Sequence, residues 1–334
     1  MAGGALRRCD ALGKFGLIME DQSPEGGYGK FDHPLITAKG EERARVALSD
    51  PQTLWFNTGT LCNIECVNCY IESSPSNDRL VYITTAEVVD YLDQLEARDW
   101  GVREIGFTGG EPFMNPDIIE MARAALERGY EVLILTNAMR PMMRPRMRAG
   151  LEALVADFGD RLTLRISVDH WSAAFHDQER GAGSFDLTIK GMEWLRDAGI
   201  QMTVAGRTMW GESDADARQG FARLYAMHRF TIDAEDAGKT VLFPEMDEKV
   251  DVPEITTACW GILGKDPGGV MCSSSRMVVK RKGALRPAVV ACTLLPYEPQ
   301  FEMGETLEQA ENAVQLNHPH CAKFCVLGGA SCSA

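Results

Sequence analysis

The sequence predicts an α/β protein: a partial (β/α)6 TIM-like barrel followed by a small C-terminal cysteine-rich α+β domain. From about residue 53, short apolar segments alternate with segments of helical spacing, as in repeated β/α units around a parallel sheet. After about residue 245 helical periodicity becomes scarce, and six of the ten cysteines lie in residues 259–334. We therefore predict an N-terminal extension over residues 1–52, the barrel over 53–245 and the cysteine-rich domain over 246–334.

The barrel strands are expected where apolar and β-branched residues gather. The six candidates are 53–57, 104–108, 131–137, 162–169, 201–207 and 240–243. In the fourth candidate Thr163, Arg165, Ser167 and Asp169 alternate with apolar residues, and the fifth repeats this more weakly. Strands of a parallel sheet buried on both faces are usually apolar throughout, so a polar face indicates the lining of a cavity.

The helices between these strands have specific start signals. Thr84 to Glu87 forms a capping box, and Asn115-Pro116 supplies a cap and a proline at a first helical position. A third apolar stripe ends at Gly159. Further helices are expected over 185–198 and 214–228, with short ones around 41–48 and 306–313.

Composition limits the class of function. Acidic residues outnumber basic ones, 48 to 34, and the net charge of −14 disfavours nucleic acid as a partner. No apolar run approaches the ~18–20 residues of a membrane helix, and the N-terminus lacks the features of a secretory signal. We therefore expect a cytoplasmic protein without a membrane partner. Ten cysteines in a reducing compartment favour metal or redox chemistry over disulfides.

The first cysteine cluster follows the first expected strand. Cys62, Cys66 and Cys69 lie within eight residues, close enough in sequence to converge on one metal centre. Iron–sulfur clusters are held by cysteine thiolates, normally four, so three leave one iron without a protein ligand. The alternatives are a zinc site, for which no fourth ligand lies nearby, or three buried thiols without metal.

The spacing Cys62-x3-Cys66-x2-Cys69-Tyr70 resembles the signature of the radical SAM superfamily. This resemblance implies a 4Fe–4S cluster whose open iron takes the amino and carboxylate groups of S-adenosylmethionine (SAM), with Tyr70 against the adenine. The segment Gly109-Gly110-Glu111-Pro112 at the end of the second strand resembles the family's GGEP segment, which binds the methionine amino group. Glycines let a backbone approach a ligand closely, and a carboxylate suits an ammonium group.

Other positions match the family less specifically. Ser167 and Asp169 match the place where members hydrogen-bond the SAM ribose, although a strand-end cap is the alternative. Arg207 is a candidate for the SAM carboxylate, with a surface salt bridge as the alternative. Asn137 is expected either to line the same cavity or to act as a cap. Residues 176–185 resemble a loop that orders the barrel mouth.

The second cysteine set resembles the SPASM and Twitch extensions of radical SAM enzymes. A hairpin over 277–291 brings Cys272 and Cys292 near each other, and a short helix follows at 304–307. The resemblance implies an auxiliary 4Fe–4S cluster, although six cysteines are too few for the full SPASM pattern and structural zinc is the alternative. The candidate ligands are Cys259, Cys272, Cys292, Cys321, Cys325 and Cys332. Cys9 stands apart and is expected to be inert.

The resemblance implies an enzyme that reductively cleaves SAM to a 5′-deoxyadenosyl radical and takes a hydrogen atom from a substrate. A small metabolite is the favoured substrate, and a ribosomally made peptide or protein is the alternative. The auxiliary cluster would bind substrate or transfer electrons, and the partner would be a reductase such as flavodoxin or ferredoxin. A non-catalytic iron–sulfur or zinc scaffold would leave the glycine segment and the polar strand faces without a purpose. No catalytic acid or base can be assigned from the sequence.

Overall fold

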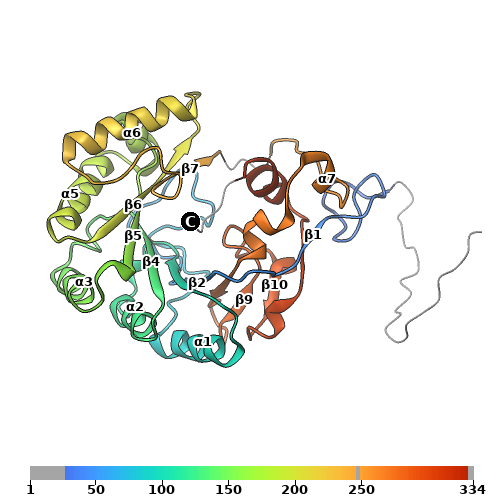
Figure 1. The fold of residues 1–334 in the computed structure, drawn as a ribbon, viewed down its shortest axis with the longest axis horizontal. Helices are drawn as coiled ribbons and strands as arrows, with labels where there is room; N and C mark the ends of the chain where they lie inside the picture. The colour runs from blue at the N-terminus through green and yellow to red at the C-terminus, as the bar shows by residue number, and fades with distance from the viewer. Residues whose placement is uncertain (1–26, 246–248, 330–334) are drawn as a thin grey trace, which may run out of the picture.

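A nine-stranded sheet organises the chain (Figure 1). The computed structural model describes residues 27–245 and 249–329. In spatial order the strands are β10 (Glu302–Gly304), β9 (Ala288–Val290), β8 (Ser275–Val279), β2 (Thr53–Asn57), β3 (Glu104–Thr108), β4 (Glu131–Thr136), β5 (Leu162–Ser167), β6 (Gln201–Thr208) and β7 (Thr240–Pro244). Strands β2 to β7 pair in parallel, in chain order. The six predicted strands and the α/β class are therefore confirmed.

Helices cover the outer side of this sheet. In chain order the α-helices of the described residues are α1 (Thr85–Arg98), α2 (Ile118–Glu127), α3 (Pro145–Phe158), α4 (Ala173–Arg180), α5 (Ser184–Asp197), α6 (Asp214–His228) and α7 (Cys259–Leu263); α4 contributes to the cavity wall, and α7 packs in the C-terminal region. In Figure 1, α1, α2, α3, α5 and α6 form an arc outside the curved strands. The main apolar core lies between them and the sheet, with Phe56 and Phe107 stacked at a centroid distance of 5.7 Å. The capping box of α1 is present as predicted, with Thr84 and Glu87 reciprocally bonded.

The alternation predicted for the fourth strand places its two faces in different surroundings. Leu164 and Ile166 are buried in the main core, whereas Arg165 and Ser167 line a cavity on the inner side of the sheet. Asp169, just beyond β5, lines the same cavity. The polar residues of β5 thus position the site.

The C-terminal hairpin is continuous with the barrel sheet. Strands β8 and β9 pair antiparallel, as predicted, and β8 also pairs in parallel with β2, Thr53 opposite Ser275. A separate two-stranded sheet joins β1 (Arg45–Val46) to β11 (Val314–Gln315). Backbone pairing therefore joins N-terminal segments of the described chain to C-terminal ones, and the domain boundary at 245/246 stays a prediction.

Four local expectations are wrong. Residues 41–48 are extended rather than helical and contain β1 (Arg45–Val46), because Arg43 and Arg45 pair with segments more than 200 residues away. Near residue 306 there is a 3-10 turn, Gln309–Glu311, rather than a longer helix, because the chain becomes extended at Asn312 and then enters β11, which pairs with β1.

Asn115 does not cap α2, which starts at Ile118 with Asp117 as its cap. The Asn115 side chain accepts from the Asp117 N–H through Oδ1, before the helix starts, and donates through Nδ2 to the carbonyl oxygens of Thr58 and Ile83. Residues 176–185, expected as a loop, are mostly helical, in the second half of α4 and the start of α5. In the part of the chain that the structure describes, no helix is long and apolar enough to cross a membrane.

Candidate functional site

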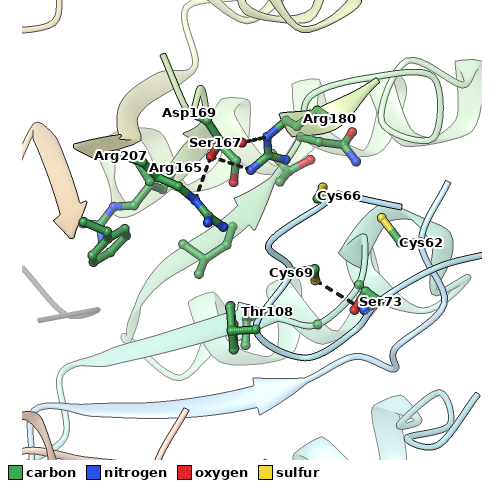
Figure 2. Close-up of a pocket in the computed structure, with 18 of the residues that line it drawn as sticks. Cys62, Cys66, Cys69, Ser73, Thr108, Arg165, Ser167, Asp169, Arg180 and Arg207 are labelled. Carbon is green, nitrogen blue, oxygen red and sulfur yellow. Dashed lines mark hydrogen bonds and ion pairs between the residues drawn. The ribbon is translucent and has the colours of Figure 1, made fainter. Parts of the chain in front are cut away.

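A cavity opens at the carboxyl ends of the parallel strands, where barrel enzymes place their active sites (Figure 2). The predicted residues that line it are Cys62, Cys66, Cys69, Tyr70, Gly109, Gly110, Asn137, Ser167, Asp169 and Arg207. Arg165, on the strand face predicted to line a cavity, also lies in the wall, together with residues that the sequence did not single out, namely Ser73, Thr108, Leu135, Thr136, Arg180, Ala205, Gly206, Phe243, Leu294 and Phe324. Glu111 and Pro112 do not line it.

The loop that carries the three cysteines is held at both ends. The Cys62 backbone N–H donates to the Ser74 carbonyl oxygen at 3.0 Å, and the Ser73 N–H donates to Cys69 Sγ at 3.3 Å. Figure 2 shows the three cysteines on this one loop, with Arg180 beside Cys66. The loop therefore presents three thiols to a common space.

Helix α4 forms hydrogen bonds with the middle of the cysteine loop. The buried Glu179 carboxylate accepts from the Asn68 backbone N–H at 2.7 Å and from Asn68 Nδ2 at 2.9 Å. The Glu179 carbonyl accepts from the Val67 N–H at 2.9 Å. Arg207 Nη2 donates to the Asn68 carbonyl oxygen at 3.0 Å. These contacts fix the two residues between Cys66 and Cys69, and sequence reasoning missed Glu179 entirely.

The two glycines after β3 allow close backbone packing. Gly109 has φ of +145°, and a Cβ there would lie 2.5 Å from the Gly59 carbonyl oxygen. A Cβ on Gly110 would lie 2.2 Å from the Leu61 carbonyl oxygen. The Gly110 N–H donates to Gly59 at 2.7 Å. Glycine is therefore required here because the turn lies directly against the chain that enters the cysteine loop.

Glu111 follows the glycine turn, and its buried carboxylate accepts three hydrogen bonds. Its carboxylate accepts from the Thr136 hydroxyl at 2.8 Å, the Asn137 N–H at 2.9 Å and the Phe113 N–H at 3.2 Å. Burial raises its pKa to about 6. Asn137 in turn donates through Nδ2 to Asn63, beside Cys62. Glu111 thus joins the ends of β3 and β4, and its predicted contact with SAM stays a prediction.

A buried charge network forms the wall opposite the glycines. Asp169 accepts from Arg180 Nε at 2.6 Å and Nη2 at 3.1 Å, and Arg207 Nε lies 3.3 Å away. Although burial acts in the other direction, these two arginines hold the pKa of Asp169 below its usual range. Arg165 lines the same cavity and donates to Thr203 at 3.2 Å. The ribose role of Asp169 and the carboxylate role of Arg207 stay predictions.

Burial disfavours the thiolate form of Cys62 and Cys66. Burial raises the pKa of Cys62 to about 12, and it also raises that of Cys66, although Arg180 acts to lower it. Metal ligation requires thiolates, so the bound centre must itself supply positive charge. The donor set fits a 4Fe–4S cluster with one open iron, because the cavity wall contains three cysteines among the described residues. No three described His, Cys, Asp or Glu side chains converge on a single metal ion.

The second cysteine set lies in a separate apolar cluster of the C-terminal region. Cys272 and Cys321 are buried in it, and Cys259, Cys292 and Cys325 pack against it. Burial raises the pKa of Cys321, with smaller contributions from the neighbouring Cys292 and Cys272.

Cys321 and Cys325 lie on one π-helical turn, Cys321–Leu327, which also places Phe324 in the cavity wall. Such turns are frequent at functional sites. The structure thus brings Cys272, Cys292 and Cys321 together, while Cys9 and Cys332 lie outside the described residues.

Comparison with known proteins agrees with this geometry. A family profile, that of the Radical SAM superfamily, matches residues 56–221. The antilisterial bacteriocin subtilosin biosynthesis protein AlbA of Bacillus subtilis is 30% identical over 236 residues, which are 69% of this chain and 49% of AlbA. The mycofactocin maturase MftC of Mycolicibacterium smegmatis is 31% identical over 159 residues, 48% of this chain and 38% of MftC. The chain thus spans about half the length, or less, of these curated relatives.

Solved structures support the fold. Streptococcus suis SuiB bound to S-adenosylmethionine superposes with a TM-score of 0.55 at 13% identity, covering 77% of this chain and 63% of SuiB. Native anSMEcpe with bound AdoMet gives a TM-score of 0.55 at 12% identity, covering 82% and 83%. The superfamily uses a 4Fe–4S cluster and SAM, and its profile spans the cysteine loop, the glycine turn and the charge network. The chain therefore belongs to the radical SAM superfamily.

Proposed function

We propose that this chain is an enzyme that binds a 4Fe–4S cluster through Cys62, Cys66 and Cys69 and places SAM in the adjoining cavity. One observation carries the proposal: the three thiols, the glycine turn and the buried arginines line a single cavity at the active-site end of the barrel. When bound, the cluster and SAM supply a 5′-deoxyadenosyl radical that takes a hydrogen atom from the substrate.

The residues of the cavity would bind SAM and orient it beside the cluster. Gly109 and Gly110 expose backbone to the cavity, and Glu111 holds this turn against β4. Arg180 is buried beside Cys66 and keeps its orientation through Asp169, so its positive charge favours thiolate and carboxylate groups. Ser167 offers a hydroxyl for the ribose, and Tyr70 an aromatic face for the adenine.

An auxiliary 4Fe–4S centre is the second part of the proposal. Its ligands would come from Cys272, Cys292, Cys321 and Cys325, four cysteines of one apolar cluster. Cys259 and Cys332 are the remaining candidates. Thiol donors in apolar surroundings suit an iron–sulfur cluster, and its role would be to bind substrate or transfer an electron. A flavodoxin or ferredoxin would reduce the cluster in the cavity.

For the substrate we propose a small metabolite. The C-terminal segment itself supplies Leu294 and Phe324 to the cavity wall, and Phe324 stacks on Phe243 at 5.5 Å, so this chain already occupies part of the mouth. The second candidate is a ribosomally made peptide. It is favoured by the names of similar proteins, a bacteriocin biosynthesis protein and a maturase, and by the solved structure of SuiB bound to precursor peptide SuiA.

Formation of 5′-deoxyadenosine tests the proposed activity. The full chain is reconstituted anaerobically with iron and sulfide, reduced with dithionite and incubated with SAM. We expect 5′-deoxyadenosine from the wild type and none from Cys62→Ala. A cluster-loaded, SAM-binding wild type that forms none in the presence of metabolite and peptide pools would contradict the proposal. Deuterium transfer from labelled pools into 5′-deoxyadenosine would then separate the two substrate classes.

A further inference from the structure

Arg276 is a buried cation in the second cysteine cluster. It lies in β8 and is 1% exposed. Its Nε donates to the Ala310 carbonyl oxygen at 2.9 Å, and its Nη1 to those of Cys272 at 2.6 Å and Ser275 at 2.8 Å. Its Nη2 donates to the Asn312 carbonyl oxygen at 3.2 Å. These acceptors are neutral, so they satisfy its hydrogen bonds without compensating its charge.

Two other arginines of the described residues whose side chains are little exposed pair with a carboxylate. Arg43 pairs with Glu254 at 2.5 Å, and Arg180 pairs with Asp169 at 2.6 Å. Within residues 27–245 and 249–329, no Asp or Glu forms such a pair with Arg276. A buried charge without a counterion costs several kcal/mol. The four carbonyl groups account for the donors of the guanidinium but not for its positive charge, which requires another explanation.

The acidic groups near Arg276 are cysteine thiols. The guanidinium contacts the Cys272 backbone directly. Met277 pairs with Val290 across the hairpin, so Cys292, two residues beyond Val290, lies beside the start of β8. Of the groups that interact electrostatically with Arg276, Cys272 and Cys292 are the two that carry negative charge when ionised. The guanidinium therefore faces two proposed ligands of the auxiliary centre.

We propose that Arg276 is the counter-cation of an iron–sulfur centre ligated by Cys272 and Cys292, and that it raises the midpoint potential of that centre. This inference rests on the auxiliary centre of the proposed function. A thiolate-ligated cluster carries net negative charge, and its potential depends on nearby charge and hydrogen bonds. Reduction adds one further negative charge, so a buried cation favours the reduced state. Arg276 acts through the ligands and is a positioning residue.

A redox titration followed by electron paramagnetic resonance tests the inference. The full chain is reconstituted in a Cys66→Ala background, which removes the cluster of the cavity and leaves the auxiliary centre. Arg276→Gln keeps a neutral donor, Arg276→Lys keeps the charge, and Met277→Ala destabilises the same strand without changing charge. We expect Arg276→Gln to lower the ratio of reduced to oxidised centre at least tenfold at fixed potential, a shift of about 59 mV for one electron. Arg276→Lys should recover most of this shift, and Met277→Ala should show none.

The other outcomes are decisive as well. An unchanged potential in Arg276→Gln, or an equal shift in Met277→Ala, would overturn the inference. If Arg276→Gln assembles no auxiliary centre, the Arg276→Lys variant provides the test. A midpoint potential equal to that of the parent would support the role of the positive charge, and loss of the centre in Arg276→Lys would refute it. If the Cys66→Ala parent itself holds no iron, the auxiliary centre and this inference both fail, while 5′-deoxyadenosine from the wild type would keep the proposed cavity site.

Discussion

Removal of the Glu179 carboxylate should release the cysteine loop. In Glu179→Ala, Asn68 loses two hydrogen bonds to a charged acceptor, at 2.7 and 2.9 Å. Hydrogen bonds to charged groups contribute about 1.5–3 kcal/mol each, so the ordered loop loses about 3–6 kcal/mol. At 1.4 kcal/mol per tenfold change, the lower value corresponds to about a hundredfold weaker retention of a cluster that needs this loop conformation.

The assay is the loss, during exposure to an iron chelator, of the resonance signal that changes when SAM is added. This signal reports the cluster in the cavity and not the auxiliary centre. Glu179→Gln keeps one acceptor oxygen and should fall between alanine and the wild type. Gln178→Ala, an exposed position on the same helix, is the matched control. If Glu179→Ala keeps the SAM-responsive signal as long as Gln178→Ala does, the proposed role of α4 in holding the loop is wrong.

Three further outcomes are expected. Gly110→Ala places a Cβ 2.2 Å from the Leu61 carbonyl oxygen and should lower the free energy of unfolding by about 3 kcal/mol in a denaturant titration, whereas Gly261→Ala, with open space, should not. Burial lowers the pKa of His176 to about 4, below the ordinary 6.5, so protonation favours the unfolded chain. The free energy of unfolding should therefore fall by about 3 kcal/mol between pH 6.5 and 4, and His176→Phe should abolish this slope. Anaerobic removal of iron should lower the melting temperature reversibly, because metal binding and folding are coupled; an unchanged melting temperature would contradict this.

The barrel could be predicted from sequence because its signals are local. Each strand is a short apolar segment, and α1 begins at a capping box whose two side chains lie three residues apart. The predictions are wrong where pairing with distant segments determines the local secondary structure. Arg45 lies in a strand because it pairs with Gln315, 270 positions away, and the turn at Gln309–Glu311 ends where the chain enters β11, which pairs with β1.

The same division applies to the site. Cys62, Cys66, Cys69 and the two glycines carry a dense local pattern, and they line one cavity. Glu179 and Asn68 are 111 residues apart in sequence, so no local spacing of residues indicates their hydrogen bond. Likewise, Arg276 looks like one polar residue in an apolar strand until the fold shows that it has no carboxylate among the described residues. A buried charge inside a strand is the signal that could have drawn attention to it.

The most direct test counts iron and 5′-deoxyadenosine in the same sample. Wild type, Cys66→Ala and Cys272→Ala are reconstituted, reduced and incubated with SAM side by side. The account predicts about eight iron atoms per chain for the wild type and about four for each variant. It also predicts that 5′-deoxyadenosine formation is lost in Cys66→Ala and that Cys272→Ala retains it. Equal iron in wild type and Cys66→Ala, or 5′-deoxyadenosine from Cys66→Ala, would contradict a cluster in the cavity.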